Sequence, residues 1–455
     1  MVRMPHSSGL PRLLDPTESL LFDSYIQRFS RTYPTHSGPS NPFLSVLVPL
    51  ASQNDVVLNS LLALSGAQGW DRTSPEMESV TLRLKHRALQ GCRALLQEGP
   101  FAAHTTNAVS GHELQMSASS QRSSISSIPN ALSEENVIFL LASSVLFLLY
   151  EKISGEENWK PHIEFINRLF NQHLHRFTST EAYQFLHSIF LYNDLVRSTS
   201  LQLPTLSSFY LRAAQPQVGD AGDRTGTQSR HYFPRLIARI STGEETVSDE
   251  DIAVWDGILD WLPSFALTEA DNESTIASPR MHHVAANHFS ATEDAQIHEG
   301  RHSENVPGPG TSDWNDQRTV SELYRTAARI FRRQILRKRQ HTTVASESGA
   351  DAYGGDEIPY LASWAIQLIQ SLPEGSVFDN ALLLPIGVAG RELTAIHSQE
   401  REYIILRLRS LEQRFQMRHF RRVQEVLINH WSRLDGTVLM PSNQDDTSRE
   451  MILFG

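Results

Sequence analysis

The sequence has little of what several classes of protein require. It contains one cysteine, Cys92, among 455 residues, which excludes an internal disulfide and any zinc site built from several thiolates of this chain. The N-terminal stretch MVRMPHSSGLPRLL lacks the apolar core of a signal peptide. The longest apolar run, Val137–Tyr150, has 14 residues, fewer than the ~20 that a membrane helix needs. We therefore expect an intracellular protein in a reducing compartment, without membrane contact.

Signatures of catalysis are also missing. The sequence has no GxSxG, no phosphate-binding P-loop, no GxGxxG after a strand, no CxxC and no HExxH. Its formal net charge of −11 gives no global electrostatic reason to bind DNA. We therefore predict no catalytic residue, no metal site and no cofactor-binding residue.

What the sequence does have is one strongly apolar helix, LSEENVIFLLASSVLFLLY, over Leu132–Tyr150. Ser133 is a good N-cap, and Glu134 and Glu135 lie in the first turn, where the helix dipole favours negative charge. Beyond Asn136 the residues are apolar on all sides apart from two serines. Such a helix has to be buried all round, so we predict that it forms the centre of a helical core.

The rest of the chain repeats apolar residues at helical spacing, and almost no segment alternates with the period of two expected of a strand. We therefore predict an all-α fold. Asn41, Asp55 and Thr180 are expected to cap helices, and Pro49 should interrupt a helical run.

Two further helical segments are expected near the C-terminus. Val320–Arg339 has a single inward stripe and predicts one helix. Arg391–Leu434 has an apolar stripe with one five-residue step, from Phe415 to Phe420, which neither turn spacing of a helix allows. We therefore predict two helices there, with a break near Met417–His419.

The domain organisation follows from composition. An apolar content of 40% is low for one compact core of this length, which indicates a core interrupted by polar insertions. Segments rich in Ser, Thr, Gly and Asn cannot bury enough apolar surface to offset their ordering entropy. We expect one helical domain over residues 14–434, with a disordered N-terminus over 1–13 and a tail over 435–455. The expected disordered insertions are about 99–130, 215–230, 268–316 and 341–357.

Several segments, in this order along the chain, resemble the regulatory domain of fungal-specific transcription factors. NPFLSVLVPLA and VVLNSLLALSGAQG are similar to the family's opening helices, and LLASSVLFLLYEKISGEENWKPHIEFINRLF to its central helix and Trp-x-x-His helix. HSIFLYNDLVRSTS resembles the next buried helix, with its Asp. LYRTAARIFRRQIL, ALLLPIGVAGREL and REYIILRLRSLEQRFQMRHFRRVQEVLINHW resemble the C-terminal third. The positions that match the family signature are Trp159, His162, Asp194, Pro385, Gly390 and Trp431.

The resemblance implies a regulatory or effector domain that controls transcription in the nucleus. The implied partners are the transcription machinery or a DNA-binding member of the same family, in a homo- or heterodimer, or a small-molecule effector. Family members usually carry six closely spaced N-terminal cysteines that hold two zinc ions, and this chain has none there. Either the DNA-binding module was lost or the gene model is truncated, so direct DNA contact by this chain is not supported.

Two other classes of function compete with this expectation. The first is a cluster-less interaction protein or co-regulator that pairs with a DNA-binding factor through a helix face. An exposed apolar stripe on Arg401–Leu434 would favour it. The second is a helical enzyme or metabolite-binding protein, which would require polar groups converging in one deep pocket.

Some residues allow both a structural and a functional interpretation. The basic residues of one predicted helix are a candidate nuclear import signal, but apolar residues interleave them, and we favour the solvated back of a core helix. Trp159 and His162 could line a ligand pocket, but we favour an anchor that packs the start of their helix. Cys92 lies on an apolar stripe and is expected to be a small core residue. The candidate import residues are Arg332, Arg333, Arg337, Lys338 and Arg339.

Overall fold

The computed structural model describes residues 10–33, 41–68, 74–97, 132–156, 158–173, 180–207, 232–244, 247–253, 311–343 and 357–436. All regular structure within these ranges is helical, without a strand, which confirms the predicted all-α fold. The predicted insertions 99–130 and 215–230 lie outside the described residues. So do most of 268–316, 341–357 and the two terminal segments.

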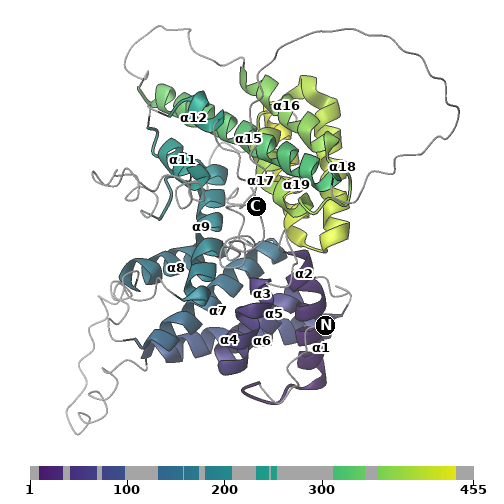
Figure 1. The fold of residues 1–455 in the computed structure, drawn as a ribbon. Coiled ribbons are helices and arrows are strands. Elements are labelled where there is room, and N and C mark those ends of the chain that lie inside the picture. Colours follow the sequence, from purple (N-terminus) through teal and green to yellow (C-terminus); the bar gives the residue numbers. More distant parts are fainter. Residues whose placement is uncertain are drawn as a thin grey trace, which may run out of the picture.

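The helices form two groups, which we call the N-terminal half and the C-terminal half (Figure 1). The N-terminal half contains α1 (Pro16–Ser24), the π-helical turn η2 (Tyr25–Phe29), α2 (Ser30–Thr32), α3 (Pro42–Ser45), α4 (Leu47–Gln53), α5 (Asp55–Ala67), α6 (Pro75–Gln97), α7 (Glu134–Ser154) and α8 (Trp159–His173). The C-terminal half contains α11 (Tyr232–Ser241), α12 (Asp249–Ala253), α15 (Thr311–Thr343), α16 (Glu357–Ser371), η5 (Asp379–Leu382), α17 (Leu383–Gly390), η6 (Ala395–His397), α18 (Ser398–Phe415) and α19 (Arg418–Leu434). Between the two halves runs α9 (Glu181–Leu201), which packs on α7, α8, α11 and α17.

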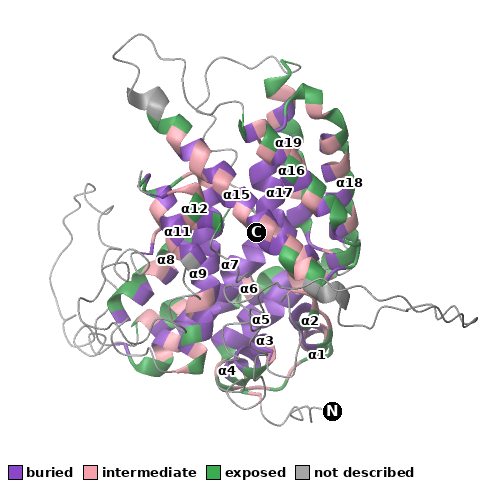
Figure 2. Cartoon of the chain, turned by 45° about the horizontal axis from the view of Figure 1, so that its top comes forward, coloured by how far each residue is buried: buried purple, intermediate pink, exposed green. Residues whose placement is uncertain are grey.

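The predicted central helix is α7. The Ser133 hydroxyl accepts a hydrogen bond from the backbone N–H of Asn136 at 3.2 Å. At the other end Gly155 adopts the left-handed conformation, with φ of 72°, that glycine reaches without steric cost. All residues of Phe139–Ile153 are buried, and α7 contacts α5, α6, α8 and α9. Buried residues gather around it (Figure 2).

The expectation that no helix of this chain reaches the length of a membrane span was wrong. The helix has 21 residues and, by length and composition, could cross a membrane, although the apolar run Val137–Tyr150 is shorter. The difference arises because the helix continues through polar residues at both ends of the run. Most of α7 is buried against other helices in this fold, and the core helix of a helical bundle meets the same criteria as a membrane span.

Besides Ser133, two of the other three predicted helix caps are present. The Asn41 side chain accepts the backbone N–H two residues later at 3.0 Å, and the Thr180 hydroxyl accepts the one three residues later at 3.3 Å. Asp55, however, is the first residue of α5 and not its cap. Asn54 is the cap, because its backbone is still extended and its side chain accepts the N–H of Val56 at 2.8 Å.

Both predicted helix breaks are present. The run after Pro42 is interrupted at Val46, between α3 and α4, and Pro49 falls in the first turn of α4, where a missing N–H is tolerated. In the C-terminal stretch, α18 ends at Phe415, and Gln416 is left-handed with φ of 56°. Because α19 begins two residues later, the two apolar stripes are out of phase.

The helix expected over Val320–Arg339 is longer than predicted, since α15 spans Thr311–Thr343. It therefore extends into both flanking stretches that were expected to be disordered. Periodicity detects only the part of a helix that packs on a core, so extra turns beyond the stripe leave no such signal. The inward residues of α15 are buried as predicted: Leu323, Ala327, Ile330 and Gln334.

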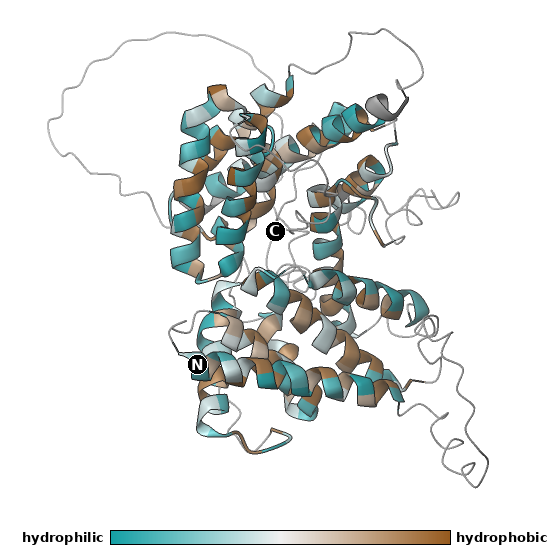
Figure 3. Cartoon of the chain, turned by 180° about the vertical axis from the view of Figure 1, so that it is seen from behind, coloured by the Kyte–Doolittle hydropathy of each residue, from teal (hydrophilic) through white to brown (hydrophobic). Residues whose placement is uncertain are grey.

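Within the C-terminal half, α17 is the most enclosed element. Every one of its residues is buried, and it contacts α15, α16, α18 and α19 as well as α9. The surrounding helices carry hydrophilic residues on their outer faces (Figure 3). In the described part of the chain, the two halves meet where α9 contacts α17 and where α7 contacts α19.

Candidate functional site

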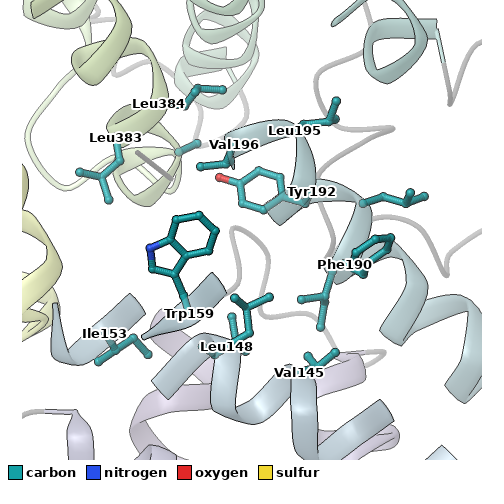
Figure 4. Packing of buried hydrophobic residues seen from close by; sticks show 14 of the residues in the cluster. Val145, Leu148, Ile153, Trp159, Phe190, Tyr192, Leu195, Val196, Leu383 and Leu384 are labelled. Atoms are coloured by element: carbon teal, nitrogen blue, oxygen red, sulfur yellow. The ribbon is translucent and has the colours of Figure 1, made fainter. Parts of the chain in front are cut away.

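The start of α8 meets α9 and α17 at Trp159. The indole is buried and points from α8 toward Leu383 of α17 and Val196 of α9 (Figure 4). The Tyr192 hydroxyl of α9 points into the same region. Aliphatic side chains surround the ring, as the interpretation of Trp159 as an anchor requires. The start of α8 is thereby fixed against both halves.

The other end of α17 is held by two further signature residues. The indole Nε1–H of Trp431 donates to the carbonyl oxygen of Gly390 at 2.7 Å. A Cβ at Gly390 would lie 3.1 Å from both terminal carbons of Leu427, so a larger residue there would require Leu427 of α19 to shift by a few tenths of an ångström. Pro385 lies in the first turn of α17, where its lack of an N–H is tolerated.

Two arginines extend this contact. The Arg391 guanidinium donates to the carbonyl of Ser200 at the end of α9, and the ring of His430 contacts the carbonyl oxygen of Arg391 at 2.9 Å. Arg401 lies over the Trp431 ring at 5.1 Å and pairs with Asp435 at 2.6 Å. Polar contacts of α17 and α19 thus extend to α9. We call the region where α9 and α17 meet the junction.

Asp194 is a buried structural carboxylate of α9. Its oxygens accept the backbone N–H groups of Leu206 and Ser207 at 2.9 and 2.8 Å, and the Nε–H of Arg197 at 3.1 Å. Burial raises the pKa of Asp194, while Arg197 and the two N–H groups oppose that change. The two backbone hydrogen bonds of this signature residue hold the segment after α9 against the helix.

His162 belongs to a second buried charge cluster. Its Nε2 lies 3.6 Å from Glu151 of α7, and Lys85 of α6 pairs with the same carboxylate at 2.8 Å. Burial acts to raise the pKa of Glu151, but His162 and Lys85 outweigh it and lower the pKa to about 2. The His162 ring also lies 5.4 Å from Phe147. His162 therefore helps to hold α8 and α6 on the end of α7.

Lys152, the next residue of α7, has a different environment. It is buried, and its Nζ donates a long hydrogen bond of 3.4 Å to the Tyr33 hydroxyl and lies 5.3 Å from the Tyr192 ring centre. No carboxylate pairs with it among the described residues. Burial alone lowers the pKa of Lys152 to about 7.

The candidate import residues are all engaged in contacts within the chain. Arg332 donates to the carbonyl of Val247 at 2.6 Å, and Arg333 pairs with Asp249 at 2.9 Å and Glu357 at 2.6 Å. The three others likewise have partners within the chain. These are Glu392 for Arg337, the Gln202 carbonyl for Lys338 and the Gly243 carbonyl for Arg339. Arg332 and Arg333 are half-buried against these segments, whereas Arg337, Lys338 and Arg339 are exposed.

The described residues show no arrangement suited to metal or thiol chemistry. Among them, no group of three His, Cys, Asp or Glu side chains could hold a metal ion. Cys92 is half-buried, and burial raises the pKa of its thiol to about 12. A thiol with that pKa is protonated at neutral pH and a poor nucleophile.

Sequence analysis missed Lys152 and its tyrosine neighbours. The available signal was a lysine placed before the terminal glycine of a helix predicted to be buried all round. Glu151 and Lys152 follow directly after the apolar run of that helix. Only the fold shows that α6 and α8 cover one side of this end and α9 the other.

The contact between Trp431 and Gly390 is expected to stabilise the junction. Trp431→Phe keeps an aromatic ring but leaves the buried Gly390 carbonyl without its donor, so the free energy of unfolding should fall by about 1–3 kcal/mol. Urea denaturation measures this change. As a control, Ile428→Ala removes an exposed side chain of the same helix and should change stability by less than about 0.5 kcal/mol. Equal losses in both variants would contradict the prediction.

Lys152 should make stability depend on pH. Its folded pKa of about 7 lies below the ordinary value of 10.5, so between these values the unfolded chain binds more protons and stability rises with pH. Lys152→Met removes this dependence. We expect wild type to gain roughly 3–5 kcal/mol relative to Lys152→Met between pH 7 and 10, measured by urea denaturation across that range. Parallel pH profiles would show that Lys152 is not a neutral buried amine.

Comparison with known proteins places this fold in a family. The family model described as "Fungal specific transcription factor domain" matches residues 19–445, a range that contains all six signature residues. No curated protein and no solved structure matches the chain. The family is a transcription factor domain and not a class of enzymes. The single cysteine of the sequence does not allow a binuclear zinc cluster within this chain. Because the family model matches most of its length, the chain belongs to the fungal specific transcription factor domain family.

Proposed function

We propose that this chain is a regulatory domain that controls gene expression in the nucleus by sensing a partner protein or a small molecule. The observation that carries the proposal is the family match over residues 19–445. The chain carries no cysteine cluster of its own. A binuclear zinc cluster needs several thiolate ligands, so the residues of this sequence do not build one.

The connection between the two halves supports a regulatory role. The short helix α17 contacts α9 with one surface and the helices of the C-terminal half with others. Trp159 of α8 points toward its start (Figure 4), and Trp431 of α19 donates a hydrogen bond to its last residue, Gly390. A ligand or partner that repacks one half then shifts the position of the other, since packed interiors transmit displacement instead of absorbing it.

A second candidate is a co-regulator that pairs with a DNA-binding factor through an exposed helix face. The face that favours it is on α16, where Tyr360 is 72% exposed and Trp364 39% exposed one turn later. Aromatic side chains of this kind are enriched at protein interfaces. On Arg401–Leu434, where an exposed apolar stripe would also favour this candidate, the exposed large apolar side chains are Leu406, Ile428 and Leu434.

Tethering tests the regulatory proposal. The full chain fused to an unrelated DNA-binding domain should change expression from a reporter with the matching binding site severalfold relative to that DNA-binding domain alone. The reason is that a regulatory domain acts wherever it is recruited. Reporter RNA measures the effect, and immunoblotting confirms equal expression. An unchanged reporter, with the fusion present in the nucleus, would contradict the proposal.

The basic residues of α15 offer a separate test. We propose that their main role is to hold α15 against α12 and α16, with nuclear import as the alternative. Arg332→Gln with Arg333→Gln should lower the free energy of unfolding by about 1–3 kcal/mol, through the lost charged hydrogen bonds. The nuclear fraction of a fluorescently labelled chain should stay unchanged.

The control for that variant is Arg421→Gln, whose side chain is 57% exposed and pairs with Glu412 on the surface. It should leave stability nearly unchanged. A double variant with wild-type stability and a reduced nuclear fraction would instead identify Arg332 and Arg333 as part of an import signal.

A further inference from the structure

Lys152 differs from every other buried charge in the described residues. The buried acids and arginines all have a partner of opposite charge. These pairs are Glu18 with Arg12, Glu151 with Lys85, Asp194 with Arg197, Asp379 with Arg407, and Arg401 with Asp435. Lys152 lies beside the rings of Tyr33 and Tyr192 and donates one long hydrogen bond to the Tyr33 phenol, and no carboxylate pairs with it in the described part of the chain. Burying an ammonium without a counter-charge is unfavourable in free energy. Such an amine is therefore neutral, or becomes charged when an anion binds beside it.

Its neighbouring carboxylate does not serve as that anion. Glu151 precedes Lys152 on α7, so the two side chains leave the helix about 100° apart. The Glu151 carboxylate is taken by Lys85 and His162, from α6 and α8. On the other side of α7, Lys152 faces Tyr33, which follows α2, and Tyr192 of α9.

The surroundings of Lys152 connect to the C-terminal half. The Tyr192 hydroxyl shares a hydrogen bond with Tyr324 of α15, and Tyr324 donates to the carbonyl of Ala381 in η5 at 2.8 Å. The Tyr33 carbonyl accepts from the side-chain amide of Asn380, also in η5. The Oδ1 of Asn380 is buried without a hydrogen-bond partner in the described part of the chain. Lys152 Nζ and this amide oxygen are two polar groups with unused bonding capacity near the junction.

We infer that Lys152 is the anion-recognition residue of a small-molecule site, and that the ligand is a small organic monocarboxylate. The ammonium pairs with the carboxylate, and the apolar body of the ligand packs against the rings of Tyr33 and Tyr192. One cation matches one carboxylate, because a phosphate or dicarboxylate would bring charge that a single lysine leaves uncompensated. The inference rests on the proposed function, since it names the class of effector to which the domain responds.

A ligand bound at this site would contact residues that are hydrogen-bonded to the C-terminal half. The carboxylate would lie beside Tyr33 and Tyr192, whose hydrogen bonds lead to Asn380 and Tyr324. Both of those residues belong to the C-terminal half. A ligand that binds one arrangement of the two halves more tightly than another shifts the population toward the first, to an extent set by the difference in affinity.

Thermal unfolding of the full purified chain tests the inference. The probes are acetate, hexanoate and benzoate at pH 7, with benzamide as an uncharged match for benzoate. Because a ligand that binds only the folded state raises its stability, at least one carboxylate should raise the unfolding temperature in a saturable way. Benzamide should not.

Variants assign the effect to this lysine. Lys152→Met keeps the length of the side chain without the charge, and it should abolish the carboxylate-dependent rise. Lys160→Met removes an exposed lysine of α8 and should retain it. Circular dichroism checks that both variants are folded, and Lys152→Gln serves as a second variant if Lys152→Met is not. No saturable rise in wild type with any of the three carboxylates overturns the inference, as does an equal rise in wild type and the Lys152 variant.

Failure of the inference and failure of the proposed function can be told apart. A chain that changes reporter expression when tethered but binds none of the carboxylates loses only the inference. A chain that binds a carboxylate through Lys152 and leaves the tethered reporter unchanged keeps the site and loses the regulatory role.

Discussion

Burial of α7 on every side is the constraint on which the rest of the fold depends. A helix enclosed in this way needs neighbours all round, and α5, α6, α8 and α9 supply them. The charged residues at its end then become buried as well. Glu151 pairs with Lys85 and His162, whereas Lys152 lies beside the rings of Tyr33 and Tyr192. The polar chemistry of the junction is a consequence of this packing.

The C-terminal half also contains a fully buried helix, α17. Because α17 is buried along its whole length, its last carbonyls need donors from other elements. Trp431 provides one, and the absence of a Cβ at Gly390 leaves room for Leu427 of α19. The same helix α19 also contacts α7 of the N-terminal half. In the described chain, α19 is therefore fixed to both halves.

Local features of this fold could be predicted from sequence, and long-range ones could not. The caps at Asn41, Ser133 and Thr180 involve partners within three residues, so the sequence contains the whole interaction. The all-α class follows from periodicity, which depends on near neighbours in the same way. The turns of α15 beyond its buried stripe were missed because packing leaves no mark on them.

The candidate site shows the same division more sharply. Trp159, His162 and Asp194 could be selected from their match to the family signature, but their contacts come from distant segments. The environment of Lys152 requires Tyr33 and Tyr192, which are more than a hundred positions apart in sequence. No spacing rule connects residues at such separations. Only the assembled helices reveal that this lysine lacks a counter-charge within the described residues.

A regulatory domain has a reason to tolerate such a residue. Replacing a buried charge by an apolar side chain is often neutral or stabilising, so an uncompensated lysine is a cost that an apolar residue would avoid. The same lysine gives the junction a state that is more stable when an anion is present. Lys152 lies beside Tyr192 of α9, and Trp431 donates to Gly390 of α17, a helix that contacts α9. An effector bound at the lysine is thereby linked to the position of α19 through packed side chains alone.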